Sequence, residues 1–135
     1  MIKKKRICVD MSCTIIHHGH IRLLKKASKF GKIFVALTSD KEIRKYKKFE
    51  PELKFSQRKE VLMACKYVYG VIKSGFYIDN NFMKKHKLDK LIHGSDNRNK
   101  LGKEYLLKFP RTPNISSTHI RYLSFKNFQK LKAVK

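Results

Sequence analysis

Short apolar runs alternate with segments of helical periodicity along most of this chain. The runs expected to form strands are residues 7–11, 33–37, 70–72, 88–93 and 105–109. A first helix is expected from the histidines at 17–20 to about Phe30, because Ile21, Leu24 and Ala27 repeat at helical spacing. Further helices are expected over 41–46, 56–67 and 78–86, and a last one opens at 116–118.

This alternation predicts an α/β fold, a Rossmann-like three-layer sandwich with a parallel five-stranded sheet and helices on both faces. Residues 33–37 are apolar without a break, which is typical of a parallel strand buried on both sides. With 135 residues the chain is expected to form one domain over residues 1–135. Ligands of such sheets bind at the carboxyl ends of the strands, where the strand order reverses.

Three histidines and a glycine, His17 to His20, stand where the first strand gives way to the first helix. His17 and His20 are three residues apart and therefore share one face of the first helical turn. The unpaired N–H groups and the dipole of that turn favour anions, and Gly19 has no Cβ to keep a ligand away. The alternatives are a surface turn with incidental histidines and a metal site, although no Cys, Asp or Glu stands at helical spacing to complete one.

Two further polar segments follow predicted strands, residues 94–97 after the fourth and residues 111–118 after the fifth. Ser116, Ser117 and Thr118 would place hydroxyls and N–H groups at a helix N-terminus, a suitable cradle for phosphate. Arg111 offers a planar, charged fork that suits phosphate oxygens. The simpler alternative is an ordinary helix cap. We expect these segments and the histidines to converge at one edge of the sheet.

Two of these motifs resemble those of a known family. His17-His18-Gly19-His20 resembles the HxGH signature of the nucleotidyltransferase superfamily that includes the small cytidylyltransferases. The segment Arg111–Thr118 resembles the RTxGISTT motif of the glycerol-3-phosphate cytidylyltransferases, and matching segments span residues 7–121 in the family's order. Lys45–Lys47 resembles the family's KxK loop, which reaches over the phosphates, and Arg58 resembles the arginine that opens its next helix.

The resemblance implies an enzyme that transfers CMP from CTP to a phosphorylated small alcohol, with glycerol 3-phosphate the best guess, and releases pyrophosphate. It further implies Mg²⁺ accompanying the triphosphate, a homodimer, and no metal ligand from the protein. The implied catalytic residues are His17, His20, Lys47 and Arg111, and the implied acceptor-binding residue is Arg58. The implied nucleotide-binding residues are Ser12, Gly19, Lys45, Gly94, Asp96, Thr112, Ile115, Ser116, Ser117 and Thr118.

The chain departs from the family pattern at several positions. Where the family has GTFD before its histidines, this chain has Met11, Cys13 and Thr14 at the Gly, Phe and Asp positions. Ser95 replaces one carboxylate of the family's GDD-like segment, and Asn114 replaces the glycine of the second motif. Asn tolerates a positive φ better than most residues. The two lost carboxylates leave the acceptor and the handling of metal open.

The formal net charge is +23, from 33 basic and 10 acidic residues, and the lysines are spread over the whole chain. Such a charge attracts polyanions, but it also attracts a triphosphate and a phosphorylated acceptor. The alternatives that stay open are ATP as the donor, another acceptor such as a sugar phosphate, a phosphonate or an amino-alcohol phosphate, and a non-catalytic module that binds nucleotide or RNA. A dedicated nucleic-acid partner is not expected.

Three cysteines without a CxxC pair are expected to be reduced thiols of a cytoplasmic protein. Cys8 and Cys65 are expected in the core. The chain has no apolar run of about 18 residues, so no membrane span is expected. The short apolar run before Asp10 also does not read as a signal peptide.

Overall fold

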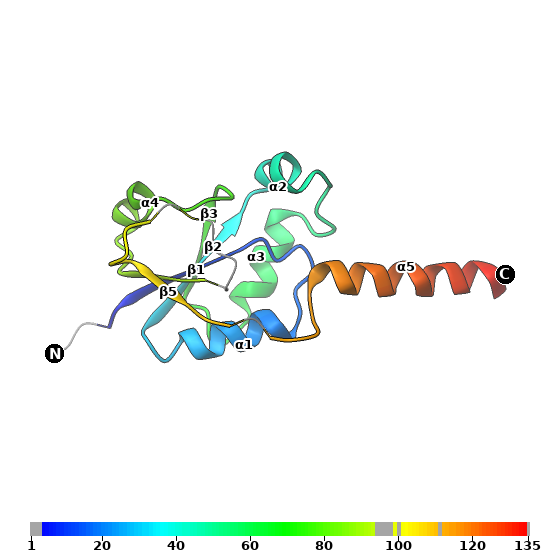
Figure 1. Ribbon diagram of the computed structural model, residues 1–135, viewed down its shortest axis with the longest axis horizontal. Helices are drawn as coiled ribbons and strands as arrows, with labels where there is room; N and C mark the ends of the chain where they lie inside the picture. The colour runs from blue at the N-terminus through cyan, green and yellow to red at the C-terminus, as the bar shows by residue number, and fades with distance from the viewer. Residues whose placement is uncertain (1–3, 94–98, 100, 111, 135) are drawn as a thin grey trace.

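The computed structural model describes residues 4–93, 99, 101–110 and 112–134 (Figure 1). Strands and helices alternate for most of its length, as the sequence predicts. In chain order the elements are β1 (Arg6–Met11), α1 (His18–Ala27), β2 (Lys32–Thr38), α2 (Asp40–Lys47), α3 (Phe55–Met63), β3 (Gly70–Ser74), α4 (Asn80–Lys85), β4 (Lys90–His93), β5 (Leu106–Lys108) and α5 (Ser117–Val134).

The five strands form one parallel sheet in the order β3-β2-β1-β4-β5. The chain adds β2 and β3 on one side of β1 and then returns to add β4 and β5 on the other. Val9 of β1 is paired with Val35 of β2 and with Ile92 of β4. The point where the strand order reverses therefore lies between β1 and β4, where an α/β sheet holds its ligand.

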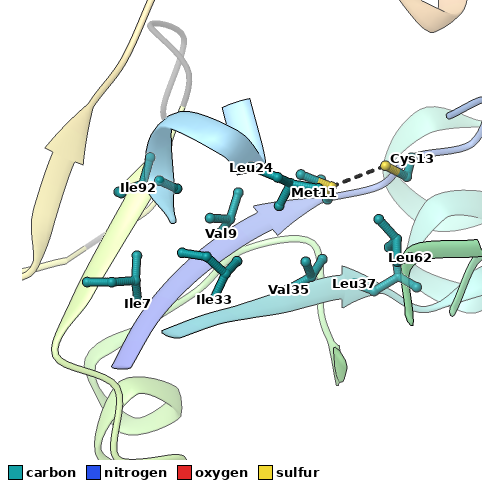
Figure 2. Close-up of a cluster of buried hydrophobic side chains, with 11 residues drawn as sticks. Ile7, Val9, Met11, Cys13, Leu24, Ile33, Val35, Leu37, Leu62 and Ile92 are labelled. Atoms are coloured by element: carbon teal, nitrogen blue, oxygen red, sulfur yellow. Dashed lines mark hydrogen bonds between the residues drawn. The ribbon is translucent and has the colours of Figure 1, made fainter. Parts of the chain in front are cut away.

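Each face of the sheet has its own apolar core, because successive strand residues point to opposite sides. Ile7, Val9 and Met11 of β1 belong to the core on one face, which Leu24 of α1 and Leu62 of α3 cover (Figure 2). Cys8 belongs to the core on the other face, together with Met83 of α4. The predicted three-layer arrangement with helices on both faces is confirmed.

Two local expectations are wrong. The basic segment at 45–47 is not a loop but the last turn of α2, which ends at Lys48 in a left-handed conformation (φ 64°). The first helix is shorter than expected, because α1 ends at Ala27 with Ser28 as its C-cap and does not reach Phe30. Gly31 follows this helix, and a Cβ there would lie 2.2 Å from the carbonyl oxygen of Lys5.

Helix α5 extends away from the body of the domain (Figure 1). Arg121 anchors its first turns, because its guanidinium donates to the hydroxyl of Thr14 at 2.9 Å and pairs with the carboxylate of Glu52. Several large apolar side chains of α5 are exposed, among them Phe125 and Leu131. No helix within the described part of the chain is both long and apolar enough to cross a membrane.

Candidate active site

A cavity of about 440 Å³ opens at the carboxyl ends of the strands, beside the N-termini of α1 and α5. Its volume lies in the range of roughly 300–1,000 Å³ that is usual for small-molecule sites. Described residues from β1, α1, β2, α2, β4 and the segments around them line it. They are Asp10, Met11, Ser12, Cys13, His17, Gly19, His20, Arg22, Leu23, Lys26, Thr38, Lys47, Phe76, Tyr77, His93, Asn99, Phe109, Pro110, Thr112, Ile115, Ser116, Ser117 and Thr118.

His17 and His20 form a reciprocal cap at the start of α1. The Nδ1 atom of His17 accepts a hydrogen bond from the N–H of Gly19 at 3.0 Å. The Nδ1 atom of His20 accepts one from the N–H of His17 at 3.1 Å. The two rings lie close together, with centroids 3.9 Å apart and planes inclined by 32°. The pair thus plays the part that a serine and a glutamate play in an ordinary capping box.

This cap fixes which nitrogen of each ring can donate. Because both Nδ1 atoms accept from the backbone, each neutral ring carries its proton on Nε2. Burial, and to a smaller degree the charge of His18, lowers the pKa of His17 below its usual value near 6.5. Both side chains line the cavity, so the start of α1 presents Nε2–H donors, whereas His18 is exposed and lies outside the cavity lining.

Gly19 is required by the cap itself. A Cβ at this position would lie 2.8 Å from Cε1 and 2.9 Å from Nδ1 of His17, and 3.2 Å from a methyl group of Ile115. The space that the missing side chain leaves is therefore filled by the His17 ring and by Ile115. Gly19 lines the cavity as expected, but its first role is to let the His17 ring lie over the helix N-terminus.

The start of α5 lines the cavity beside α1 through Thr112, Ile115 and the segment 116–118, as the motif predicts. Two of its hydroxyls have structural partners. Ser116 Oγ accepts from the N–H of His119 at 3.0 Å, and Ser117 Oγ donates to the carbonyl of Ile15 at 2.9 Å. Ser117 thus uses its hydroxyl proton within the protein, whereas the Ser116 hydroxyl can still donate to an anion, beside the N–H groups of the first turn.

Asn114 has φ 63°, so it takes the left-handed conformation that a glycine provides in the family motif. The turn before α5 can therefore form without that glycine.

Cations line the cavity from two helices. Gly19, Arg22, Leu23 and Lys26 follow the i, i+3, i+4, i+7 pattern of one helical face, so α1 brings two cations to the cavity. Lys47, at the end of α2, lines it as well. Arg22 and Lys26 were not predicted, although the helical spacing from Gly19 is visible in the sequence.

Lys45 does not line the cavity with Lys47. Positions two apart on a helix lie on nearly opposite sides, and the Lys45 ammonium instead lies 5.1 Å from the ring centroid of Tyr46. Lys47 therefore lines the cavity, as a phosphate contact would require, and Lys45 does not. In the loop that the sequence predicts here, the two lysine side chains could have pointed the same way.

Arg58 does not contact the cavity, contrary to its expected role in binding the acceptor. Its side chain is fully buried in α3. Its guanidinium donates to the carbonyls of Leu53 at 3.0 Å, Ser12 at 2.7 Å and Thr38 at 2.8 Å, and to the carboxylate of Asp40 at 2.6 Å. Arg58 ties the ends of β1 and β2 to α2, so it supports the cavity wall from behind.

The pKa of Asp40 reflects this pairing. Burial alone would raise it, but the Phe55 N–H, the guanidinium of Arg58 and the charge of Arg44 together hold it below its ordinary value. The carboxylate therefore stays ionised beside Arg58 well into the acidic range.

A second histidine site, formed around His93, lies where the strand order reverses. His93 Nδ1 lies 2.5 Å from Oδ1 of Asp10, and Asn99 Nδ2 donates to Oδ2 of the same carboxylate at 2.9 Å. Asp10 and His93 stand one position beyond the paired residues Val9 and Ile92 of β1 and β4. The register that joins them, 83 residues apart, is not visible in the sequence.

Two residues that depart from the family pattern, Thr14 and Cys13, are buried at the wall of the cavity. Thr14 is buried and accepts from Arg121, whose charge is balanced by Glu52. Cys13 is buried with φ 50°, and its thiol donates to the Met11 sulfur at 3.1 Å (Figure 2). Burial raises the pKa of Cys13 to about 12, so it is an inert packing residue at neutral pH.

Three expected site residues, Gly94, Asp96 and Arg111, lie outside the described residues. Within the described part of the chain, no group of three or more His, Cys, Asp or Glu is arranged to hold a metal ion. Asp10 is the one carboxylate among the described cavity residues, and both of its oxygens accept from His93 and Asn99.

Several known proteins are similar in sequence to this chain. Residues 14–123 match the cytidylyltransferase-like family. The glycerol-3-phosphate cytidylyltransferase of Bacillus spizizenii is 27% identical over 122 residues, 87% of this chain and 95% of that protein. The probable ethanolamine-phosphate cytidylyltransferase of Encephalitozoon cuniculi is 27% identical over 95 residues, and the matched part covers 70% of this chain but only 30% of that longer protein.

Two further matches widen the range of relatives. The FAD synthase of Thermococcus kodakarensis is 35% identical over 96 residues, which cover 70% of this chain and 64% of that protein. Among solved structures, the lipopolysaccharide core biosynthesis protein of Thermoplasma volcanium superposes with a TM-score of 0.68 at 19% identity, over 80% of this chain and 98% of that one. That last match confirms the fold.

Proposed function

Because the chain belongs to the cytidylyltransferase-like family, we propose that it is a nucleotidyltransferase that transfers CMP from CTP to a phosphorylated small alcohol. Glycerol 3-phosphate is the best candidate for the acceptor, since the chain matches a glycerol-3-phosphate cytidylyltransferase over nearly the full length of both proteins. The observation that carries the proposal is the reciprocal histidine cap, which supplies ring N–H donors at a helix N-terminus in a cavity lined with cations.

The reaction needs no protein nucleophile. An oxygen of the acceptor's phosphate attacks the α-phosphorus of CTP, and a new P–O bond forms there. The bond from the α-phosphorus to the oxygen that bridges it to the β-phosphate breaks, and pyrophosphate leaves with that electron pair. The attacking oxygen is already an anion, so no proton has to be removed. The barrier comes from bringing anions together and from orienting them.

The cavity residues suit this task. His17 and His20 donate from Nε2 to the α-phosphate and to the bridging oxygen as charge develops there. Lys47, Arg22 and Lys26 offset the charge of the triphosphate and of the acceptor. The N–H groups at the start of α5 hold phosphate oxygens.

We propose that Mg²⁺ enters with the triphosphate and is not held by the protein beforehand. The described cavity offers one carboxylate, Asp10, whose oxygens already have partners. This donor set fits an ion that takes most of its ligands from phosphates and water and needs few from the protein. When bound, the ion would offset phosphate charge.

A second candidate is adenylyl transfer from ATP. The match to a FAD synthase at 35% identity favours it, because the product in that name, flavin adenine dinucleotide, contains an adenine nucleotide. The cations and donors described above contact phosphates, which CTP and ATP share, so they do not choose between the two bases.

A pyrophosphate-release assay tests the proposal. CTP and ATP are each combined with glycerol 3-phosphate, phosphoethanolamine, a sugar phosphate, a phosphonate and FMN. We expect release with CTP and one or more small phosphorylated alcohols, and formation of the matching CDP-alcohol by mass spectrometry. Release with ATP alone would support the second candidate.

Absence of pyrophosphate release with every pair, together with RNA binding that weakens steeply with salt, would instead support a non-catalytic binding module.

The homodimer also stays a prediction, and a monomeric mass by light scattering at working concentration would contradict it.

A further inference from the structure

The Asp10 carboxylate at the end of β1 receives two hydrogen-bond donors. Asn99 Nδ2 donates to Oδ2 at 2.9 Å, and His93 Nδ1 lies 2.5 Å from Oδ1. The amide of Asn99 is itself oriented, because its Oδ1 accepts from the N–H of Ile78 at 2.6 Å. Asp10, His93 and Asn99 all line the cavity, and the side chains of Asp10 and His93 are 10% and 18% exposed.

These contacts fix the tautomer of His93. An ionised carboxylate only accepts, so the proton between Asp10 and His93 belongs to Nδ1 of the ring. In the neutral ring the remaining nitrogen, Nε2, is then an acceptor with a lone pair. This is the opposite arrangement to His17 and His20, whose Nδ1 atoms accept from the backbone and whose Nε2 atoms carry the proton.

An acceptor of this kind complements the rest of the cavity. The described cavity residues that are proposed to contact the phosphates are donors or cations: His17, His20, Arg22, Lys26 and Lys47. A nucleotide and a phosphorylated alcohol also carry hydroxyl or amino groups, which need acceptors once they leave water. The carboxylate of Asp10 and the amide oxygen of Asn99 are already accepting from the protein.

We propose that His93, held by Asp10 and Asn99, accepts a hydrogen bond at Nε2 from a hydroxyl or amino group of a bound substrate. His93 is then a specificity-determining residue, and Asp10 and Asn99 are positioning residues. The group belongs either to the nucleotide or to the acceptor. The inference rests on the proposed function for the choice of substrates, while the state of the ring can be tested without turnover.

The first experiment reads the ring directly by ¹⁵N NMR of histidine-labelled protein, in the wild type and in Asp10→Asn. In the wild type, His93 should show a protonated Nδ1 and an unprotonated Nε2. In Asp10→Asn, the oxygen of the new amide can accept from Asn99 while its NH₂ group donates to His93 Nδ1. The proton of the ring should therefore move to Nε2. A wild-type ring protonated at Nε2, whether alone or together with Nδ1, would overturn the inference.

The second experiment measures KM for CTP and KM for the acceptor separately, in His93→Phe and in Asp10→Asn. One hydrogen bond to the substrate is worth roughly a three- to tenfold change in affinity. We expect a rise of that size in the KM of the substrate that His93 contacts, with kcat changed less. His93→Gln, which keeps an acceptor, should recover part of the loss. His86→Phe is the matched control, because it replaces a ring outside the cavity, packed on Phe82.

The two KM values show which substrate carries the hydroxyl or amino group. The experiments also distinguish a failure of this inference from a failure of the proposed function. A rise confined to the KM for CTP assigns the group to the nucleotide. A rise confined to the KM for the acceptor assigns it to the acceptor. If the wild type turns over while His93→Phe leaves both KM values at the level of His86→Phe, the inference is wrong. If the wild type shows no turnover, the proposed function fails. The inference is then judged by whether added CTP or glycerol 3-phosphate shifts the Nε2 resonance of His93, and no shift with either overturns it.

Discussion

Replacing Arg58 with methionine tests whether Arg58 supports the wall of the cavity, as its contacts indicate, or binds the acceptor. Methionine keeps an unbranched, flexible apolar stem but removes the guanidinium, with its charge and all of its donors. The carbonyls of Ser12 and Thr38 and the carboxylate of Asp40 would lose the partners they have in α3. Because Thr38 is buried, water cannot readily replace that contact.

The expected loss of stability follows from those contacts. Breaking one side of a buried ion pair costs about 3–5 kcal/mol. Asp40 is 29% exposed, so water offsets part of that cost and the lower end, about 3 kcal/mol, is the better value. At about 4 °C for each kcal/mol in a domain of this size, the melting temperature should fall by about 12 °C.

Thermal unfolding followed by circular dichroism measures this change, and Lys59→Met, an exposed neighbour on α3, is the matched control. The control should change stability by less than about 0.5 kcal/mol. In Arg58→Met, kcat and both KM values should change together if they change at all. An unchanged melting temperature with a raised KM for the acceptor alone would refute the wall assignment and restore direct contact with the substrate.

Three further predictions concern the cavity. Lys47→Ala should weaken nucleotide binding, measured by isothermal titration, roughly ten- to a hundredfold, because a charge-assisted contact is worth about 1.5–3 kcal/mol. Lys45→Ala on the same helical turn should leave nucleotide binding nearly unchanged. Equal losses in the two variants would mean that the lysines act only through the general positive charge of the protein. Gly19→Ala should reduce kcat roughly tenfold to a hundredfold, since its Cβ would lie 2.8 Å from the His17 ring and displace it; a normal kcat would contradict the cap. The lowered pKa of His17 keeps the ring neutral at pH 7, and protonation of its Nδ1 would break the cap. Activity and the stability of the His17 cap should therefore both decline only as the pH falls below 6.5, and a decline that begins above 7 would contradict this.

The sheet could be predicted from the sequence because its signals are local. Continuous apolar runs such as 33–37 indicate buried parallel strands, and polar residues after several strands indicate one common edge. The histidines at the start of α1 were placed correctly for the same reason, since a strand-to-helix junction in an α/β fold is also a site for anions.

The features that could not be predicted are the directions of individual side chains and the pairing of β1 with β4. The sequence does not tell whether the Arg58 side chain points into the cavity or behind it, because its partners Ser12 and Asp40 come from distant parts of the chain. Lys45 and Lys47 differ only through the helical rotation between them, and a segment taken for a loop hides that difference. Asp10 and His93 meet only because β4 returns to lie beside β1, which is a property of the sheet as a whole.

The central claim is that ring N–H donors from the reciprocal histidine cap stabilise the transferring phosphoryl group, and the turnover of His20→Ala tests it most directly. Alanine has no side-chain donor and favours a helix, and His17 can still accept the N–H of Gly19, so α1 should keep its start. The same substitution at His18, which is exposed and outside the cavity lining, is the control. With saturating CTP and acceptor, His20→Ala should reduce pyrophosphate release by a factor on the order of 10²–10³, as the loss of a transition-state donor does in other enzymes, while His18→Ala stays near the wild type. Equal turnover in the two variants, with both proteins folded, would contradict the claim.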